Sequence, residues 1–243
     1  MRLTGASHPA GGLGLTVLRG DGSVEQVNLQ RPAPRLPLRP LSLAEILQHG
    51  LPQNGLSDEV NEWRRRNRPN LMRGLRRVAA ARALGLPTMY GQLWLRVFRG
   101  DGRVVDLGLA SLRVVTDAGV AAIVDAFQNS VEIEDFRYHG FGTGNTAEAA
   151  GQTALVTELT TQYATDNTRP TGSQTENGAN VYRTVATLDP DADVGITEHG
   201  IFRQAATGGG TMLDRSVFSV VNLVGATGDA LQPTYDFTLT SGG

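Results

Sequence analysis

Histidines are the residues of this chain best suited to acid–base or metal chemistry, and they lie at His8, His49, His139 and His199. No two of them have the i, i+4 spacing with which one helix face holds a metal ion. Glu198 directly precedes His199, but neighbouring residues of a strand point to opposite faces of a sheet, so the two are not predicted to act together on a substrate. The chain also lacks cysteine and any GxSxG segment, and we predict neither an enzyme nor a cofactor.

Two polar loops are partial matches to ligand-binding loops. FGTGNTA at residues 141–147 is rich in glycine, but it has neither the lysine nor the following helix start of a phosphate-binding loop. DPDAD at residues 189–193 begins like a calcium loop, but the glycine and the distal glutamate that such a loop needs are missing. We interpret both as turns, with a structural calcium ion at residues 189–193 as the alternative.

Arginine is the residue type whose spacing does indicate binding chemistry. Residues 64–77 hold seven arginines in fourteen positions, and a guanidinium group binds carboxylates and phosphates with equal ease. Trp63 beside the cluster could stack on a base, so nucleic-acid binding is one interpretation. The slightly acidic chain shows no nucleic-acid fold signature, and docking on an acidic protein surface is therefore favoured. The predicted partner-binding residues are Arg35, Arg39, Arg64, Arg65, Arg66, Arg68, Arg73, Arg76 and Arg77.

Charge is distributed unevenly along the sequence. Residues 1–113 contain 17 arginines and 8 acidic residues, which gives +9 (17 − 8), and residues 114–243 contain 5 arginines and 16 acidic residues, which gives −11 (5 − 16). Together they make the net charge of −2. The asymmetry predicts that the first half meets an acidic partner, while the second half faces solvent or the basic half of a neighbour.

A repeated segment occurs twice within the first half. LGLTVLRGDGSVEQVNL at residues 13–29 and LWLRVFRGDGRVVDLGL at residues 93–109 share nine of seventeen residues. Apolar residues alternate before each Asp-Gly pair, which is typical of a β-hairpin with a tight turn. The RGD triplet could also serve cell adhesion, but the turn chemistry explains it without a receptor.

The first half of the chain outside the repeats predicts an arm with short helices. RPAPRLPLRP at residues 31–40 has four prolines, which indicates an extended tether. Helices are predicted over residues 42–50, with Ser42 as N-cap, and over residues 57–67. A further, separate basic helix is predicted after Pro69.

A fourth helix is predicted after the second repeat, beginning at the N-cap Thr116. Its apolar residues recur at i, i+3, i+4 and i+7, which predicts that this face packs on the core; they are Val120, Ile123, Val124 and Phe127.

From residue 131 onward, short apolar runs alternate with turn-rich spacers, as in an antiparallel β-sandwich. RSVFSVVNLV is apolar on both faces and is predicted to be central or covered by a partner. The fold class is therefore mainly β, an antiparallel sandwich with one packed helix, preceded by a hairpin and a basic, proline-rich helical arm. The predicted domains are the arm at residues 1–87 and the sandwich at residues 88–243.

The second half resembles a family of tailed-bacteriophage virion structural proteins. The resemblance covers residues 112–243 and depends on the order of several segments rather than on one motif. It does not extend to residues 1–90. The segments that carry it are VVTDAGVAAIVDAFQNSVEIEDFRYHGFGTGNTAEAAGQTAL, GSQTENGANVYRTVATL, ITEHGIF, TMLDRSVFSVVNLV and the closing TYDFTLTSGG.

The resemblance implies a capsid cement or decoration protein, a β-sandwich that bridges neighbouring major capsid subunits and stabilises the shell. It further implies a homotrimer on the capsid surface of the virion, made in the host cytoplasm, with the arm as the capsid-binding part. The alternative within this resemblance is a tail, neck or fibre protein that takes part in attachment or host recognition. No apolar run approaches the length of a membrane span, and no membrane partner is predicted.

Overall fold

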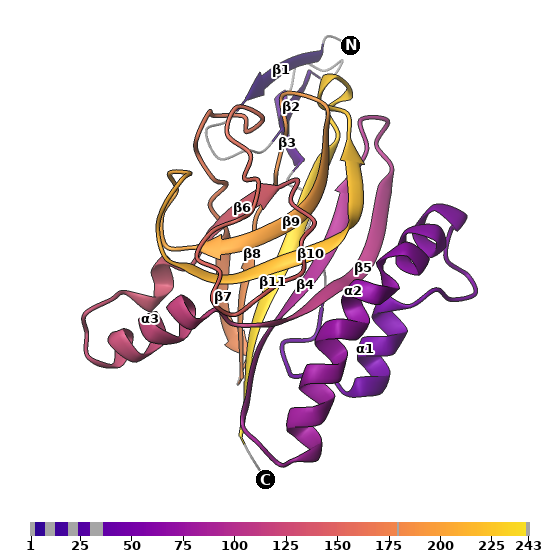
Figure 1. Cartoon of the computed structure of the whole chain (residues 1–243). Coiled ribbons are helices and arrows are strands. Elements are labelled where there is room, and N and C mark those ends of the chain that lie inside the picture. The colour runs from indigo at the N-terminus through magenta and orange to yellow at the C-terminus, as the bar shows by residue number, and fades with distance from the viewer. Residues whose placement is uncertain (1–2, 8–12, 19–23, 30–35, 179, 242–243) are drawn as a thin grey trace. The chain divides into compact units, whose positions relative to one another are not determined.

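A computed structural model describes residues 3–7, 13–18, 24–29, 36–178 and 180–241 (Figure 1). The chain forms two compact units, Met1–Leu36 and Pro37–Gly243. The sequence placed this boundary after residue 87. It falls earlier because two helices, α1 (Leu43–Gly50) and α2 (Asp58–Ala83), pack on the strands of the larger unit instead of forming a separate arm.

The smaller unit is an antiparallel sheet in the order β1-β2-β3. Its strands are β1 (Leu3–Ser7), β2 (Leu13–Leu18) and β3 (Val24–Leu29). Strands β2 and β3 pair from Leu13 opposite Leu29 to Leu18 opposite Val24, which confirms the first predicted hairpin. Its RGDG turn lies outside the described residues.

The larger unit contains two antiparallel sheets, and the predicted mainly-β fold with a packed helix is confirmed. The five-stranded sheet has the order β5-β4-β11-β8-β7 and the three-stranded sheet the order β10-β9-β6. One apolar cluster joins them, with Leu93, Leu231, Phe141, Ile196 and Phe218 among its members. The strands are β4 (Thr88–Phe98), β5 (Val104–Val114), β6 (Tyr138–Gly142), β7 (Ser173–Gly178), β8 (Val181–Val185), β9 (Val194–Phe202), β10 (Met212–Leu223) and β11 (Ala230–Thr240).

The second repeat forms the hairpin of β4 and β5, as predicted. The N–H of Gly102 donates to the Arg99 carbonyl, and Gly102 has a φ of +88°, a conformation that glycine adopts without strain. The Arg99 guanidinium binds Asp229 at 2.9 Å and Glu59 at 2.8 Å, while Asp101 binds Arg103 at 2.7 Å. Both charged residues of this RGD triplet are therefore bound within the chain, which favours the turn interpretation over adhesion.

Helix α2 differs from the two predicted helices because it continues through Pro69 without a break. Proline has no N–H to donate to the carbonyl four residues earlier, which here belongs to Arg65. Both residues are exposed, so water can satisfy that carbonyl. Packing of the same helix on both sides of Pro69 outweighs the local preference for a break.

Helix α3 (Asp117–Phe127) begins at the predicted cap, where Thr116 Oγ1 accepts the N–H of Gly119 at 2.9 Å and donates to the carbonyl of Met212. The predicted core face is confirmed only for Ile123, which packs against the apolar cluster that contains Ile201 and Tyr235, and it is wrong for the other three residues. Gly119 and Ala122 are the buried residues, while Val120, Val124 and Phe127 are exposed. A Cβ at Gly119 would lie 2.5 Å from the Leu213 carbonyl oxygen, so the small residues let the helix lie directly on β10.

Two short 3₁₀ turns complete the larger unit, η1 (Ile133–Asp135) and η2 (Gly225–Thr227). The apolar strand predicted to be central or covered by a partner is β10. It lies at the edge of its sheet, and α2 and α3 of the same chain cover it.

Candidate interaction surfaces

Helix α2 is held by polar contacts to the edge strands of both sheets. Asn67 Nδ2 donates to the Ala110 carbonyl of β5 at 2.7 Å, and its Oδ1 accepts the N–H of Ser219 in β10 at 2.9 Å. The indole N–H of Trp63 donates to the Ser219 carbonyl at 3.0 Å, while its buried ring joins the core. The helix therefore closes one side of the sandwich and fixes the direction in which its other side chains point.

Two of the predicted partner-binding arginines face inward and are used within the chain. Arg64 is 5% exposed and donates from Nε to the Leu107 carbonyl at 2.9 Å and from Nη1 to the Leu51 carbonyl at 3.1 Å. Arg73 binds the half-buried Glu148 at 3.0 Å. Arg64 is not available to a partner, because every third or fourth position of this helix faces the sandwich. This corrects the prediction for Arg64.

The remaining arginines of the cluster form an exposed row. Arg65 pairs with Glu62 one turn earlier, and Arg66 lies 3.9 Å from the same carboxylate. The side chains of the other three form no hydrogen bond or ion pair with any residue that the structure describes; they are Arg68, Arg76 and Arg77. We call the exposed residues Arg65, Arg66, Arg68, Arg76 and Arg77 the arginine face of α2.

The two arginines predicted in the proline-rich tether have different outcomes. Arg35 lies outside the described residues. Arg39 is exposed and binds Glu45, the residue that also accepts the Ser42 N–H in the capping box of α1. The side chain of Arg39 therefore stabilises the start of α1 and is at most partly available to another molecule.

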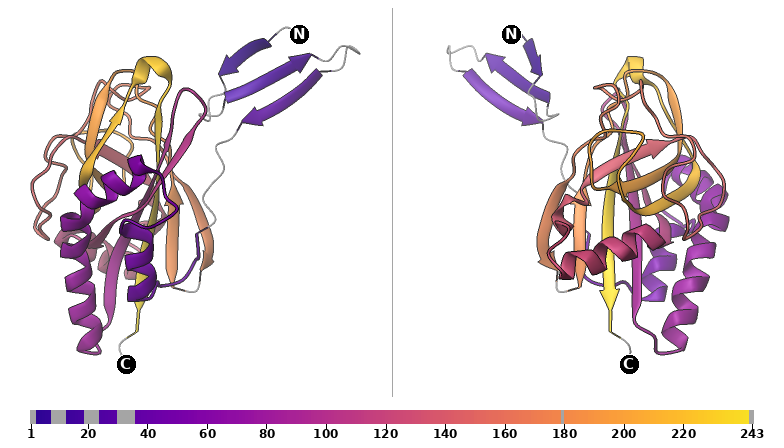
Figure 2. Two further views of the ribbon diagram at one scale, coloured as in Figure 1. Left: turned by 90° about the vertical axis from the view of Figure 1, so that its right-hand side faces the viewer. Right: turned by 60° about the vertical axis from the view of Figure 1, so that its left-hand side comes forward.

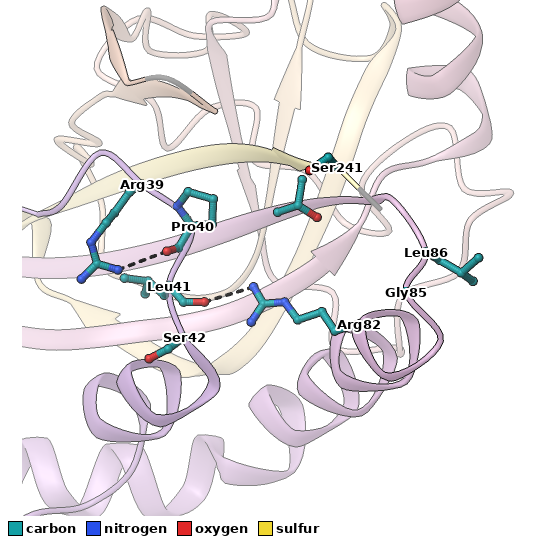
Figure 3. Close-up of a pocket in the computed structure, with 9 residues that line it drawn as sticks. Arg39, Pro40, Leu41, Ser42, Arg82, Gly85, Leu86 and Ser241 are labelled. Atoms are coloured by element: carbon teal, nitrogen blue, oxygen red, sulfur yellow. Dashed lines mark hydrogen bonds between the residues drawn. The ribbon is translucent and has the colours of Figure 1, made fainter. Parts of the chain in front are cut away.

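A hollow beside α1 is the candidate small-molecule pocket (Figure 3). Its wall includes Arg39 and Arg82. Arg82 Nη2 donates to the Leu41 carbonyl at 3.0 Å and to the Tyr90 hydroxyl at 2.8 Å, and Arg39 is paired with Glu45. Since both guanidinium groups already have partners within the chain, a carboxylate for Arg39 and a carbonyl and a hydroxyl for Arg82, we assign no ligand to the hollow.

A second exposed surface lies on α3 and the turn that follows it. Phe127 is 87% exposed, Val124 51%, Ile133 45% and Val120 38%. We call these four side chains the apolar patch of α3. Four carboxylates around it form no ion pair with a described residue; they are Asp117, Asp125, Glu132 and Glu134. Clustered exposed apolar side chains of this kind mark an interaction site more often than scattered ones do.

Glu198 and His199, neighbours in the sequence, bind different partners in the sandwich. Glu198 is fully buried, pairs with Arg215 at 2.7 Å and accepts the N–H groups of Gly144, Val156 and Thr157. It thereby holds the loop that follows β6. No local sequence pattern indicates this role of Glu198, because its partners are far away along the chain.

His199 lies against a second histidine between the sheets. His139 Nδ1 is 2.9 Å from His199 Nε2, and His139 Nε2 is 3.2 Å from the Thr184 hydroxyl of β8 in the other sheet. Burial lowers the pKa of His139 to about 3 and that of His199 well below its usual range. Both imidazoles are therefore neutral at pH 7 and serve as a buried hydrogen-bonded link between the sheets.

Comparisons with known proteins give no match to a family model, to a curated protein or to a solved structure. Among the described residues, no group of three or more His, Cys, Asp or Glu could hold a metal ion, and no helix is long and apolar enough to cross a membrane. The arginine face of α2 and the apolar patch of α3 are thus the candidate binding surfaces of the described chain.

Proposed function

We propose that this protein is a non-enzymatic structural protein of a tailed-phage virion, of the capsid cement or decoration type. It stabilises the shell by bridging neighbouring major capsid subunits, and the arginine face of α2 is its docking surface. The order of the sequence segments in residues 112–243 supports the phage origin. The sandwich of two sheets joined by one apolar cluster supports a scaffolding role.

The unpaired arginines of α2 are the observation that carries this proposal. Residues 63–87 contain eight arginines and no acidic residue. Three of these guanidinium groups point to solvent with no carboxylate from the described chain beside them. Opposite charges across an interface speed association and fix its register. The row therefore suits an acidic protein surface, on a capsid subunit or on a neighbouring copy.

Binding to particles tests the proposal. Particles of the phage that encodes this chain, prepared without it, are mixed with purified protein and sedimented. We expect co-sedimentation that weakens as salt rises, because the Debye length falls from about 10 Å at 0.1 M to about 3 Å at 1 M. Co-sedimentation that fails at low salt would overturn the proposed role.

A pair of matched variants locates the docking surface. Arg76→Gln with Arg77→Gln should weaken binding by roughly tenfold, since two charged contacts are lost. Arg103→Gln with Arg137→Gln removes the same charge from other positions and should leave binding close to that of the wild type. Equal losses in both would mean that net charge, and not the arginine face, governs binding.

The copy number in assembled particles separates the cement role from the alternative tail, neck or fibre role. A cement protein follows the repeated capsid lattice, whereas a tail or neck protein follows the low rotational symmetry of the tail. Quantitative mass spectrometry against the major capsid protein distinguishes them. A gel-shift measurement with duplex DNA at moderate salt tests the nucleic-acid interpretation, and we expect no shift.

A further inference from the structure

We infer that the arginine face of α2 binds the apolar patch of α3, with its surrounding carboxylates, on a second copy of this chain. The inference rests on the proposed function, because it takes the acidic protein surface that the arginine face meets on the shell to be that of a neighbouring copy, so that each bound copy assists the binding of the next. The contact is head-to-tail: α2 of one copy meets α3 of the next.

Complementary charge is the first argument. The segment from Asp117 to Phe136 contains five acidic residues and no arginine, whereas residues 63–87 contain eight arginines and no acidic residue. Four of the five carboxylates and three of the guanidinium groups have no ion-pair partner among the described residues. Each surface therefore carries the unpaired charge that the other lacks.

Apolar surface is the second argument. The α3 patch exposes Phe127, Val124, Val120 and Ile133, and the turn directly after α2 exposes Leu84 (73%) and Leu86 (51%). An interface between these surfaces would remove apolar side chains from water on both sides while the charges pair at the rim. A small-molecule partner would not match the length of either surface.

The placement of the two surfaces is the third argument. Figures 1 and 2 show α3 and α2 on opposite sides of the sheets of the larger unit. Two different, complementary surfaces on opposite sides of one unit produce a heterologous contact, which repeats from copy to copy and closes into a ring when the rotation allows. A two-fold contact of α3 with α3 would instead bring eight carboxylates together (2 × 4) around the apolar patches, which is unfavourable.

Charge exchange tests the inference on the purified full chain. Sedimentation velocity at low salt should show concentration-dependent association of the wild type. Arg76→Glu with Arg77→Glu, and separately Glu132→Arg with Glu134→Arg, should each abolish it, because like charges then face each other. Mixing the two variants should restore association, because each reversed surface finds an opposite one. All four residues are exposed, so the melting temperature should stay near that of the wild type.

The controls make each outcome decisive. Asp166→Arg with Asp191→Arg makes the same charge change on exposed loops and should leave association intact. Phe127→Ser should weaken association without a charge change. A wild type that stays monomeric at low salt, or an α2 reversal that leaves association unchanged, would overturn the inference. Monomers that still bind particles would overturn this contact and leave the proposed function standing; self-association without particle binding would do the reverse.

Discussion

Helices α2 and α3 begin in the same way, yet they present opposite surfaces to solvent. Ser57 caps α2 and Thr116 caps α3, and acidic residues follow both caps. Helix α2 buries its large apolar side chains, Trp63 and Leu71 among them, and exposes arginines. Helix α3 buries Gly119 and Ala122 and exposes valines and a phenylalanine. The comparison teaches that an apolar helix face need not pack on the core of its own chain.

Low pH should have the largest effect of all the changes proposed here, because it lowers the stability of the sandwich that lies between the two helices. The unfolded chain protonates its histidines below pH 6.5, whereas the folded chain keeps His139 neutral down to about pH 3. The free energy of unfolding should therefore fall as pH falls through this window, by up to about 1.4 kcal/mol per pH unit for each buried imidazole. Urea unfolding between pH 7 and pH 4 measures it. The double variant His139→Leu, His199→Leu should flatten the dependence; an unchanged slope would contradict the assignment.

Truncating one large side chain on each helix tests the comparison directly. Trp63→Ala should lower the free energy of unfolding by about 3–5 kcal/mol, because it empties a core position and removes the bond to Ser219. Phe127→Ala should change it by no more than about 0.5 kcal/mol, because the ring is in water. Urea titration of both variants gives the two values. Similar losses would mean that α3 uses its apolar face within the chain after all.

One glycine on each helix allows close approach to a strand, and alanine should disrupt both contacts. A Cβ at Gly74 of α2 would lie 1.9 Å from the Leu112 carbonyl oxygen, and one at Gly119 of α3 would lie 2.5 Å from that of Leu213. Each substitution should cost about 1–3 kcal/mol, with Gly74→Ala the more severe. Thermal unfolding ranks them. As a control, Ala79→Gly on α2 should cost less, about 1 kcal/mol, through helix propensity alone.

Substitution of the two N-cap residues should have the smallest effect on the free energy of unfolding. Ser57→Ala removes one bond to the Val60 N–H and should cost about 1 kcal/mol. Thr116→Ala also removes the bond to the buried Met212 carbonyl and should cost up to about 2 kcal/mol. Unfolding monitored by circular dichroism compares them, with Thr116→Ser as the variant that keeps both bonds. A larger loss for Ser57→Ala would reverse the ranking.

The sequence predicted much of the fold because alternation and turn chemistry are local signals. Both Asp-Gly hairpins follow from them, and so do the apolar runs between turn-rich spacers after residue 131, which form the strands β6, β8, β9, β10 and β11. A local rule divides α2 at Pro69, but the contacts on both sides of the proline decide that the helix continues. The core face predicted for α3 is wrong, except at Ile123, for a related reason. Periodicity shows that one face is apolar, but it does not show what covers that face.

The candidate surfaces were only partly predictable. The arginine cluster was visible as composition, but helical phase and long-range acceptors decide that Arg64 turns inward to Leu107 while Arg76 turns outward. The buried ion pairs could not be recognised in the sequence, because Glu198 meets Arg215 only after β9 and β10 pair. Such partners become neighbours through topology, which no local pattern records.

The position of α2 across β5 and β10 has one more consequence. An uncovered outer strand can recruit a strand from another molecule, and repeated recruitment leads to fibrils. Hydrogen bonds from Asn67 to both of these strands hold α2 over their edges and block strand recruitment on this side of the sandwich. Neighbouring copies would therefore meet on this side through side-chain contacts, which are specific and reversible. Strand pairing between the backbones of two copies is blocked here.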